Sequence, residues 1–446
     1  MGRFFGTDGV RGKAGQYPLD IPTIRRLGAA LGRVLGHGSP GVRFLAGRDT
    51  RESGEWIERE LAAGITSQGG TLTSAGVIPT PAIAYLTPRM GYTAGVVISA
   101  SHNPFADNGI KVFSGTGEKF TERLEDEVES MMTTLSDSPA DAGHDDRAVE
   151  EIDYRSDYIS HLLAILPPHE RHNSERIVVD CANGATTTVA PALFRQLGFD
   201  AKCIGCAPDG RNINLGCGST APELLARTVV EGGFRMGIAY DGDGDRAIFV
   251  DAAGRVVDGD AVMLMCGKQM KAEGRLKGNA IVATVMSNIG LEIALREAGI
   301  DLVRCAVGDK YVMEEMLKRG LSLGGEQSGH VIFSEYLFTG DGLATSLNVL
   351  RTMTATGREL ADLASELTTY PQILLNVRVD RKVDLETIPE VASVMSAVEA
   401  RLSGHGRLLV RYSGTEPLLR VMLEGRDEIE IRRWGEEIVE AVRKHA

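Results

Sequence analysis

Three stretches of the chain repeat one pattern of apolar and polar positions. They begin at Val42, Arg176 and Asn279, and each runs from an apolar segment through a polar turn into an amphipathic helix, a glycine and a second apolar segment. Strands and helices that alternate in this order are typical of mostly parallel α/β sheets. The pattern therefore predicts three similar mixed-sheet α/β domains.

The last part of the chain follows a different pattern. Apolar alternation predicts a strand over 373–380 and two strands around a turn within 407–425. Helical spacing of apolar residues predicts helices over 391–402 and 428–445. These four segments predict a smaller C-terminal α+β domain, unlike the three before it.

Breaks between the domains are marked by changes in composition. Residues 135–151 are acidic, rich in small residues and poor in large apolar ones, which predicts a linker. Further breaks are expected near 251–260 and 367–372. We therefore predict domains at 1–150, 151–255, 256–369 and 370–446.

The charge and cysteine content narrow the classes of function. The 446 residues carry a formal net charge of −13, which argues against nucleic-acid or anionic-membrane partners because these need a basic face. The N-terminus lacks an apolar signal segment, and no apolar run approaches the roughly 20 residues of a membrane span, so a cytoplasmic location is expected. Cys203 and Cys206 form a C-x-x-C pair, but Pro208 and Gly210 stand where a redox motif would begin its helix.

The stretch "VVISASHNPFADNGIKVF" (96–113) combines a strand pattern with an unusual turn. Val96 to Ile98 are apolar and β-branched, and Pro104 prevents the strand from continuing. Ser101 follows the strand directly and is expected to be held rigidly toward solvent. Such a serine suits a nucleophile or phosphate carrier, but Ser, Asn and Pro also favour an ordinary turn.

The stretch "AYDGDGDRAIFVD" (239–251) predicts a metal site. Asp241, Asp243 and Asp245 alternate with glycines directly after an apolar run, and three carboxylates this close together require a cation or many hydrogen bonds. Oxygen ligands suit a hard ion such as Mg²⁺. An EF-hand is excluded because Arg246 and Ala252 occupy the positions of its required glycine and glutamate. We expect one Mg²⁺ per active site.

Two further glycine-containing loops carry polar groups suited to a phosphorylated sugar. "GGEQSGH" (324–330) offers hydroxyl ligands and a titratable imidazole, and "RYSGTEPLLR" (411–420) offers hydroxyls, backbone N–H groups and a guanidinium for phosphate. Taken alone, each loop is compatible with a plain turn or hairpin. The candidate ligands in these loops are Glu326, Ser328, His330, Arg411, Ser413, Gly414, Thr415 and Arg420, and Arg11 and Lys111 add cations from "FGTDGVRG" and "NGIK".

The four loops fall one to each predicted domain and complement one another chemically. They supply a rigid serine, a metal triad, hydroxyl ligands and a phosphate cradle. Phosphoryl transfer depends mainly on positioning and on neutralising charge. The combination therefore predicts an enzyme that moves a phosphoryl group through a phosphoserine at Ser101.

The motifs "FGTDGVRG", "SASHNP", "DGDGDR", "GGEQSGH" and "RYSGTEP" occur in the order found in the α-D-phosphohexomutases, and the chain resembles that family over essentially its whole length. The resemblance implies four domains around a central active-site cleft, in a cytoplasmic homodimer. "GEQSGH" is similar to the glucosamine type of sugar loop, which implies interconversion of glucosamine 6-phosphate and glucosamine 1-phosphate toward UDP-N-acetylglucosamine.

By motif position, the resemblance also assigns roles to residues. Ser101 would be activated by phosphorylation, and a phosphoserine oxygen would join the three aspartates around Mg²⁺. Lys111, Arg11, His330 and Arg246 would stabilise charge or transfer protons, with no single base assigned. Glu326, Ser328 and the C-terminal loop with Arg420 would bind the substrate.

Two departures and several alternatives stay open at this point. Tyr412 stands where a proline is common in the family and Lys310 where arginine is usual, so the grip on the substrate there is in question. The alternatives are a phosphomannomutase/phosphoglucomutase of the same family, an aspartyl-phosphate phosphatase, a non-catalytic sugar-phosphate binding module and, as a minor option, a serine hydrolase.

Overall fold

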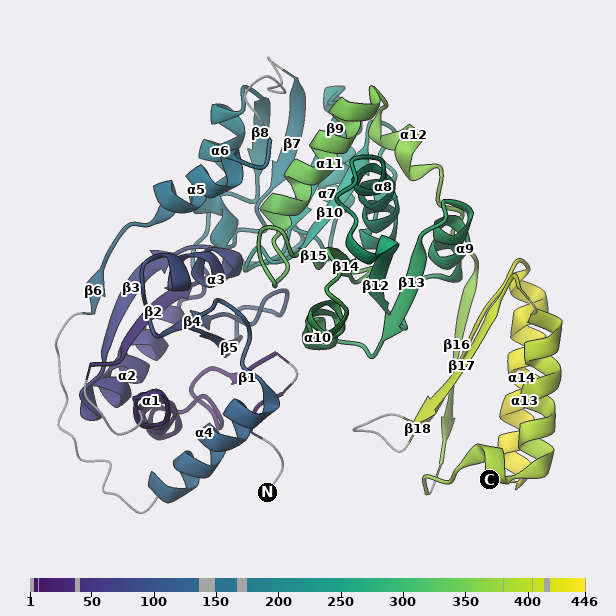
Figure 1. Cartoon of the computed structure of the whole chain (residues 1–446), viewed down its shortest axis with the longest axis horizontal. Coiled ribbons are helices and arrows are strands. Elements are labelled where there is room, and N and C mark those ends of the chain that lie inside the picture. Colours follow the sequence, from purple (N-terminus) through teal and green to yellow (C-terminus); the bar gives the residue numbers. More distant parts are fainter. Residues whose placement is uncertain are drawn as a thin grey trace. The chain divides into compact units, whose positions relative to one another are not determined.

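The computed structural model describes residues 4–6, 8–36, 41–135, 149–166, 175–379, 381–402, 404–412 and 418–445. The strands form four sheets, which are shown with the helices in Figure 1. The predicted four-domain α/β class with mixed sheets is confirmed. The chain divides into two compact units: Met1–Met286 with Val303–Ala364, and Ser287–Leu302 with Ser365–Ala446. Among the described residues, no helix is both long and apolar enough to cross a bilayer.

The first sheet has six strands in the order β1-β5-β4-β2-β3-β6. The four strands β4, β2, β3 and β6 are parallel to one another. Strand β5 is antiparallel to both of its neighbours, β4 and β1. Its elements are β1 (Val10–Lys13), α1 (Ile21–Leu35), β2 (Arg43–Arg48), α2 (Gly54–Ser67), β3 (Thr71–Val77), α3 (Thr80–Arg89), β4 (Ala94–Ile98), β5 (Asp107–Ser114), α4 (Glu122–Leu135) and β6 (Glu150–Glu151).

The second sheet has the order β11-β10-β9-β7-β8, and the third has the order β13-β12-β14-β15. Antiparallel strands β9 and β10 form a hairpin in which Tyr240 lies opposite Ala247, so the aspartate-rich stretch is the turn between them. The second group comprises α5 (Arg155–Leu163), β7 (Arg176–Asp180), α6 (Ala190–Gln196), β8 (Asp200–Ile204), α7 (Glu223–Gly232), β9 (Met236–Tyr240), β10 (Ala247–Asp251) and β11 (Val256–Val257). The third comprises α8 (Gly259–Ala272), β12 (Ala280–Thr284), β13 (Asp301–Cys305), α10 (Asp309–Arg319), β14 (Leu323–Gly325), β15 (Val331–Phe333), α11 (Gly342–Thr356) and α12 (Leu360–Ala364).

The C-terminal sheet is antiparallel throughout, with the order β16-β18-β17. Glu424 at the end of β18 is fully buried; it accepts the N–H of Ile289 at 3.2 Å and pairs with Arg407 at 2.9 Å. These contacts attach the start of α9 to this sheet. The elements of this unit are α9 (Ile289–Glu297), β16 (Gln372–Arg378), α13 (Pro389–Leu402), β17 (Arg407–Tyr412), β18 (Leu418–Glu424) and α14 (Glu428–His445).

Helices α1 and α2 pack closely because glycines remove side chains from their contact. A Cβ on Gly64 would lie 2.1 Å from the carbonyl oxygen of Arg25, and a Cβ on Gly28 would lie 2.3 Å from that of Leu61. Neither distance is tolerated by a real methyl group. The two backbones therefore approach one another directly, which fixes the helix layer on the first sheet.

Gly64→Ala should destabilise the first unit. The new methyl group would overlap backbone atoms, and overpacking of this kind costs about 1–3 kcal/mol. Gly32→Ala is the matched control, because its Cβ would first meet the Gln68 side chain at 3.2 Å. Calorimetry should show a lower melting temperature for Gly64→Ala than for Gly32→Ala, and equal temperatures would contradict the close packing.

Candidate active site

Ser101 lies in a tight turn just after β4, as the sequence predicted, but the expectation that it faces solvent is wrong, because its hydroxyl is buried against Asp241. It is 1% exposed and has a φ of +53°, a left-handed conformation that costs energy in a residue with a Cβ. Its N–H donates to Ser99 Oγ at 2.9 Å, and its carbonyl accepts from Arg51 Nη2 at 3.1 Å and Asn214 Nδ2 at 2.9 Å. The turn is therefore held from both sides.

A buried ion pair supports this turn from below. Arg51 and Asp49 are paired and almost fully buried, and Asp49 also accepts the hydroxyl of Ser99. Arg51 Nη2 donates in addition to the carbonyl of Asn103 at 2.6 Å. Sequence reasoning missed both residues, although "DTR" (49–51) directly follows β2 as "SASHNP" follows β4, the strand beside it.

The three aspartates of the β9–β10 turn converge as predicted. Asp241, Asp243 and Asp245 are all buried, with carboxylate oxygens within 4.8 Å of one another. Ser101 Oγ donates to Asp241 Oδ2 at 2.5 Å. A Cβ on Gly242 would lie 2.5 Å from the Ser101 carbonyl oxygen, so the glycine between the aspartates lets the serine turn approach.

The triad fits a divalent cation. Burial and the neighbouring charges of Asp245 and Asp243 raise the pKa of Asp241 well above its usual value. Among the described residues, Asp243 Oδ1 and Asp245 Oδ1 are buried without a hydrogen-bond donor. Unpartnered buried carboxylate oxygens are costly unless a cation binds them. The donor set contains oxygen alone, which suits Mg²⁺.

Lys111 is a buried cation shared by three carboxylates. Its Nζ lies 2.8 Å from Asp243 Oδ2, 3.0 Å from Asp8 Oδ2 and 3.3 Å from Asp245 Oδ2. Burial opposes its charge, but these carboxylates raise the pKa of Lys111 well above its usual value. The side chain is therefore a permanent ammonium group.

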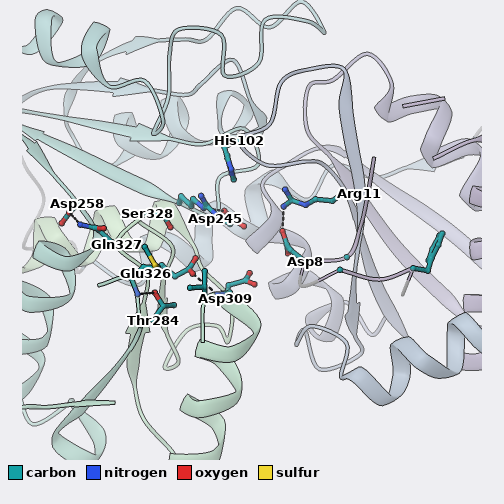
Figure 2. Close-up of a pocket in the computed structure, with 17 residues that line it drawn as sticks. Asp8, Arg11, His102, Asp245, Asp258, Thr284, Asp309, Glu326, Gln327 and Ser328 are labelled. Carbon is teal, nitrogen blue, oxygen red and sulfur yellow. Dashed lines mark hydrogen bonds and ion pairs between the residues drawn. The ribbon is translucent and has the colours of Figure 1, made fainter. Parts of the chain in front are cut away.

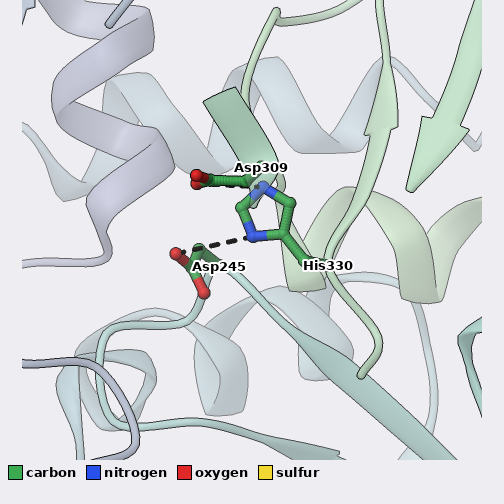
Figure 3. A group of neighbouring side chains, drawn as sticks. All are labelled: Asp245, Asp309 and His330. Atoms are coloured by element: carbon green, nitrogen blue, oxygen red, sulfur yellow. Dashed lines mark ion pairs between the residues drawn. The ribbon is translucent and has the colours of Figure 1, made fainter. Parts of the chain in front are cut away.

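A second series of contacts runs from Asp245 through His330, Asp309 and Lys119 back to Asp8. Lys119 Nζ lies 2.6 Å from Asp8 Oδ1 and also pairs with Asp309. His330 lies between Asp245 and Asp309, with each ring nitrogen 3.6 Å from a carboxylate oxygen (Figure 3). We call this closed set the charge ring: Asp8, Lys111, Asp243, Asp245, His330, Asp309 and Lys119.

His330 is a bridging member of the charge ring. Burial and the N–H of Gly340, which donates to Nε2 at 3.0 Å, favour its neutral form. The charges of Asp245 and Asp309 outweigh both and raise the pKa of His330 above its usual value. Asp245, Asp309 and His330 also lie close enough to hold a metal ion, but Lys119 already neutralises Asp309. The ring interpretation is therefore preferred for these three.

Two arginines border the aspartates. Arg11 pairs with Asp8 and donates from Nη1 to the carbonyl of Ala100 at 3.4 Å. Arg246 donates its main-chain N–H to Asp241 Oδ1 at 3.2 Å, and its Nε lies 3.8 Å from Asp245 Oδ1. Both guanidinium groups line the adjoining cavity, so they offer positive charge to an anionic ligand there.

A cavity of about 910 Å³ opens beside the charge ring (Figure 2). Glu326 and Ser328, the predicted sugar ligands, line it, and so does His102. The Nδ1 of His102 lies 3.3 Å from Ser101 Oγ, and burial together with Arg246 and Arg11 lowers the pKa of His102. The imidazole of His102 is therefore held in its neutral form next to the serine.

The remaining predicted residues lie in the other compact unit. Arg411 and Arg420 face one another across β17 and β18. Ser413, Gly414 and Thr415 lie outside the described residues. The phosphate cradle therefore stays a prediction.

The two departures from the family pattern have structural partners. Tyr412 donates its hydroxyl to the carbonyl of Val383 at 2.8 Å, which ties β17 to the neighbouring segment. Lys310 does not line the large cavity; its Nζ pairs with Glu125 Oε2 at 2.9 Å, and both side chains are buried. Lys310 thus joins α10 to α4 and lies apart from the cavity in which the sugar loop lies.

Three members of the charge ring were missed by sequence reasoning. Asp8, Lys119 and Asp309 lie in "GTDG", "TGEK" and "VGDK", where Asp8 and Asp309 are next to a glycine and Lys119 is two residues from one. The pairing of these groups depends on segments more than 100 residues apart, with Lys119 and Asp309 separated by 190. One sequence without an alignment carries no signal for such pairs.

Comparison with known families agrees with this architecture. Four models of phosphoglucomutase/phosphomannomutase domains match the chain: α/β/α domain I at residues 2–138, domain II at 156–254, domain III at 258–370 and the C-terminal domain at 374–441. The chain belongs to the phosphoglucomutase/phosphomannomutase family, the α-D-phosphohexomutases, and is an isomerase.

Curated relatives narrow the comparison within the family. A phosphoglucosamine mutase of Syntrophotalea carbinolica is 47% identical over 99% of this chain and 98% of its own length. One from Solibacter usitatus is 48% identical with the same coverage of both chains. Both matches are full-length, so the chain is similar to these enzymes in all four domains.

Solved structures share the fold. A phosphoglucomutase/phosphomannomutase family protein of Burkholderia thailandensis matches with a TM-score of 0.81 at 22% identity, covering 99% of this chain and 97% of that one. The N-acetylphosphoglucosamine mutase of Aspergillus fumigatus, solved with GlcNAc-6P and magnesium, matches with a TM-score of 0.68 at 18% identity over 99% and 95% of the chains.

Asp243→Asn should weaken Mg²⁺ binding at least about tenfold, because the variant removes one of three converging charges and tenfold corresponds to only about 1.4 kcal/mol. Asp251→Asn is the matched control: Asp251 is equally buried but is satisfied by Arg255 and two main-chain N–H groups. Titration calorimetry with Mg²⁺ checks both variants. Equal affinity in Asp243→Asn and the unmodified protein would contradict the assignment of the triad.

Lys119→Met should lower mutase activity at least about tenfold, which requires a loss of only about 1.4 kcal/mol of transition-state stabilisation. The variant leaves Asp8 and Asp309 without their shared cation, which displaces His330 and Lys111. Lys310→Met is the control. It breaks another buried ion pair, between α10 and α4, and Lys310 does not line the cavity. Both variants should lower the melting temperature, and a loss of activity of the same size in both would show that only domain packing matters.

Proposed function

We propose that the chain interconverts glucosamine 6-phosphate and glucosamine 1-phosphate through a phosphoserine at Ser101 and a bisphosphorylated sugar. The observation that carries the proposal is the position of Ser101 Oγ, 2.5 Å from Asp241 and beside a cavity that bears the sugar loop. The full-length similarity to phosphoglucosamine mutases supports the amino-sugar substrate.

In the forward direction, a hydroxyl of the sugar attacks the phosphorus of phosphorylated Ser101. The bond from phosphorus to Ser101 Oγ breaks as the bond to the sugar oxygen forms, and the hydroxyl proton passes to a base. His102 meets the requirements for that base, because its lowered pKa keeps it neutral and it lies beside Ser101. In the second step, Ser101 Oγ attacks the phosphorus of the other phosphate, the bond from that phosphorus to its sugar oxygen breaks, and the base returns its proton to the sugar oxygen as Ser101 becomes phosphorylated again.

Charge stabilisation comes from the cations around the reacting group. Lys111 stays protonated, so it neutralises negative charge instead of accepting a proton. Arg11 and Arg246 approach the same place from the cavity wall. A Mg²⁺ ion held by Asp241, Asp243 and Asp245 would draw electron density from the phosphoryl oxygens when bound. His330 then holds Asp245 in position from behind.

Substrate binding is assigned by the same proposal. Glu326 and Ser328 would bind the sugar hydroxyls, and the C-terminal loop with Arg411, Ser413, Gly414, Thr415 and Arg420 would bind the phosphate that does not react. The single phosphoserine must receive either end of the sugar, so the remote phosphate needs a site that accepts both orientations. Assembly as a homodimer in the cytoplasm, without nucleic-acid or membrane partners, belongs to the same proposal.

Phosphoglucomutase/phosphomannomutase activity is the alternative within the family, and the curated relatives favour the glucosamine reaction over it. An aspartyl-phosphate phosphatase would not need Ser101. The contact between Ser101 Oγ and Asp241 therefore favours the mutase over the phosphatase.

Ser101→Ala should abolish turnover of glucosamine 6-phosphate, by at least about a thousandfold, because the phosphoryl carrier is lost. Ser160→Ala on the exposed face of α5 is the control, since the hydroxyl of Ser160 donates to the carbonyl of Ser156 in its own helix. A coupled assay and intact-mass measurement of covalent phosphate should be run on both variants. Substantial residual turnover in pure Ser101→Ala would overturn the phosphoserine role and restore the phosphatase reading.

A further inference from the structure

The proposed substrate differs from other hexose phosphates by a positive charge. An amino group at carbon 2 has a pKa on the order of 8, as an α-amino group does, and is largely protonated at neutral pH. A hydroxyl at the same carbon carries no charge. A protein that selects amino sugars therefore gains from placing an unneutralised carboxylate in the sugar site.

Five carboxylates line the cavity, and most of them already pair with cations. Asp8, Asp245 and Asp309 belong to the charge ring, where lysines lie within ion-pair distance of each. The two that remain are Asp258 and Glu326. The charge of Glu326 contributes to the raised pKa of Arg246, so Glu326 already acts on a cation.

Among the described residues, the donors to the Asp258 carboxylate are neutral. Its Oδ1 accepts the N–H of Ala261 at 3.2 Å, as the N-cap of α8, and its Oδ2 accepts Gln327 Nε2 at 3.0 Å. Within the described part of the chain, no lysine or arginine lies within 4.0 Å of its carboxylate. Each oxygen of a carboxylate can accept a second hydrogen bond. Asp258, which lines the cavity, therefore has spare acceptor capacity and no lysine or arginine within ion-pair distance among the described residues.

The position of Asp258 is fixed by the sugar loop. The amide of Gln327 holds the carboxylate from one side, and the N–H of Gly259 donates to the Gln327 carbonyl at 3.0 Å. A Cβ on Gly259 would lie 2.1 Å from the carbonyl oxygen of Glu326, so the loop and the start of α8 are in direct contact. Figure 2 shows Asp258 and Gln327 joined beside Glu326 and Ser328.

We propose that Asp258, held in place by Gln327, binds the 2-ammonium group of an amino-sugar phosphate and is a specificity-determining residue of this cavity. The inference rests on the proposed function and goes beyond it by naming the group that distinguishes glucosamine phosphate from glucose phosphate. Glu326 and Ser328, on the same loop as Gln327, remain available to bind the hydroxyl groups of the sugar.

The test compares two substrates on one pair of variants. Asp258→Asn keeps the shape of the side chain and its capping hydrogen bond but removes the charge. We expect kcat/KM for glucosamine 6-phosphate to fall at least about tenfold, the scale of a charge-assisted hydrogen bond. The inhibition constant or kcat/KM for glucose 6-phosphate should change less than about threefold, because no ammonium is present.

Asp20→Asn is the matched control. Asp20 caps α1 through the N–H of Thr23 at 3.0 Å and does not line the cavity, so both substrates should be unaffected. Gln327→Leu leaves the charge but releases the carboxylate, and should reduce the preference for glucosamine phosphate less than Asp258→Asn does. In the unmodified protein the preference should fall as the pH rises above the pKa of the substrate's amine, and in Asp258→Asn it should be independent of pH.

The outcomes separate this inference from the function on which it rests. An equal loss on both substrates, or an unchanged preference and pH profile in Asp258→Asn, would overturn the role of Asp258 while leaving the mutase intact. Failure of the unmodified, phosphorylated protein to convert glucosamine 6-phosphate at all would overturn the proposed function itself.

Discussion

The arrangement of the first compact unit depends on how seven ionisable groups, five of them buried, neutralise one another. An isolated carboxylate buried as deeply as Asp243 would cost several kcal/mol. In the charge ring, each carboxylate has at least one cationic neighbour, and each lysine is shared between carboxylates from different domains. Removing one member changes the charge balance of each member that it contacts. The relative placement of the groups around Ser101 is therefore determined collectively.

This collective balance also explains why the site tolerates a metal-binding triad. The aspartates supply more negative charge than Lys111 alone can offset, and two of their oxygens have no donor among the described residues. Lys111 offsets part of the negative charge of the aspartates, and a bound divalent cation would offset the rest. Polarity is thus built into the scaffold before any ligand arrives, which is what preorganised electrostatic catalysis requires.

The sequence alone predicted the elements that depend on local pattern. The strand-helix-strand repeats and the positions of Ser101 and Asp241 followed from apolar periodicity and from the chemistry of neighbouring residues, and the structure places them together. Asp8 and Asp309 could not be found this way, because their role comes from partners that are distant in the chain. Lys310 shows the reverse case. Its place in a motif suggested a substrate contact, whereas its ammonium group is satisfied by Glu125 on α4.

The contact between Gly242 and the Ser101 carbonyl has a consequence for recombination between relatives. The metal turn and the serine turn come from different sheets, yet the backbone of one occupies the space where the other would have a side chain. Asn214 bonds to the same carbonyl, so a third segment is matched to this contact. A chimera that exchanges one of these domains must therefore inherit a compatible surface on the other. The serine turn and the aspartate turn must therefore be exchanged together, although they lie about 140 residues apart in the chain.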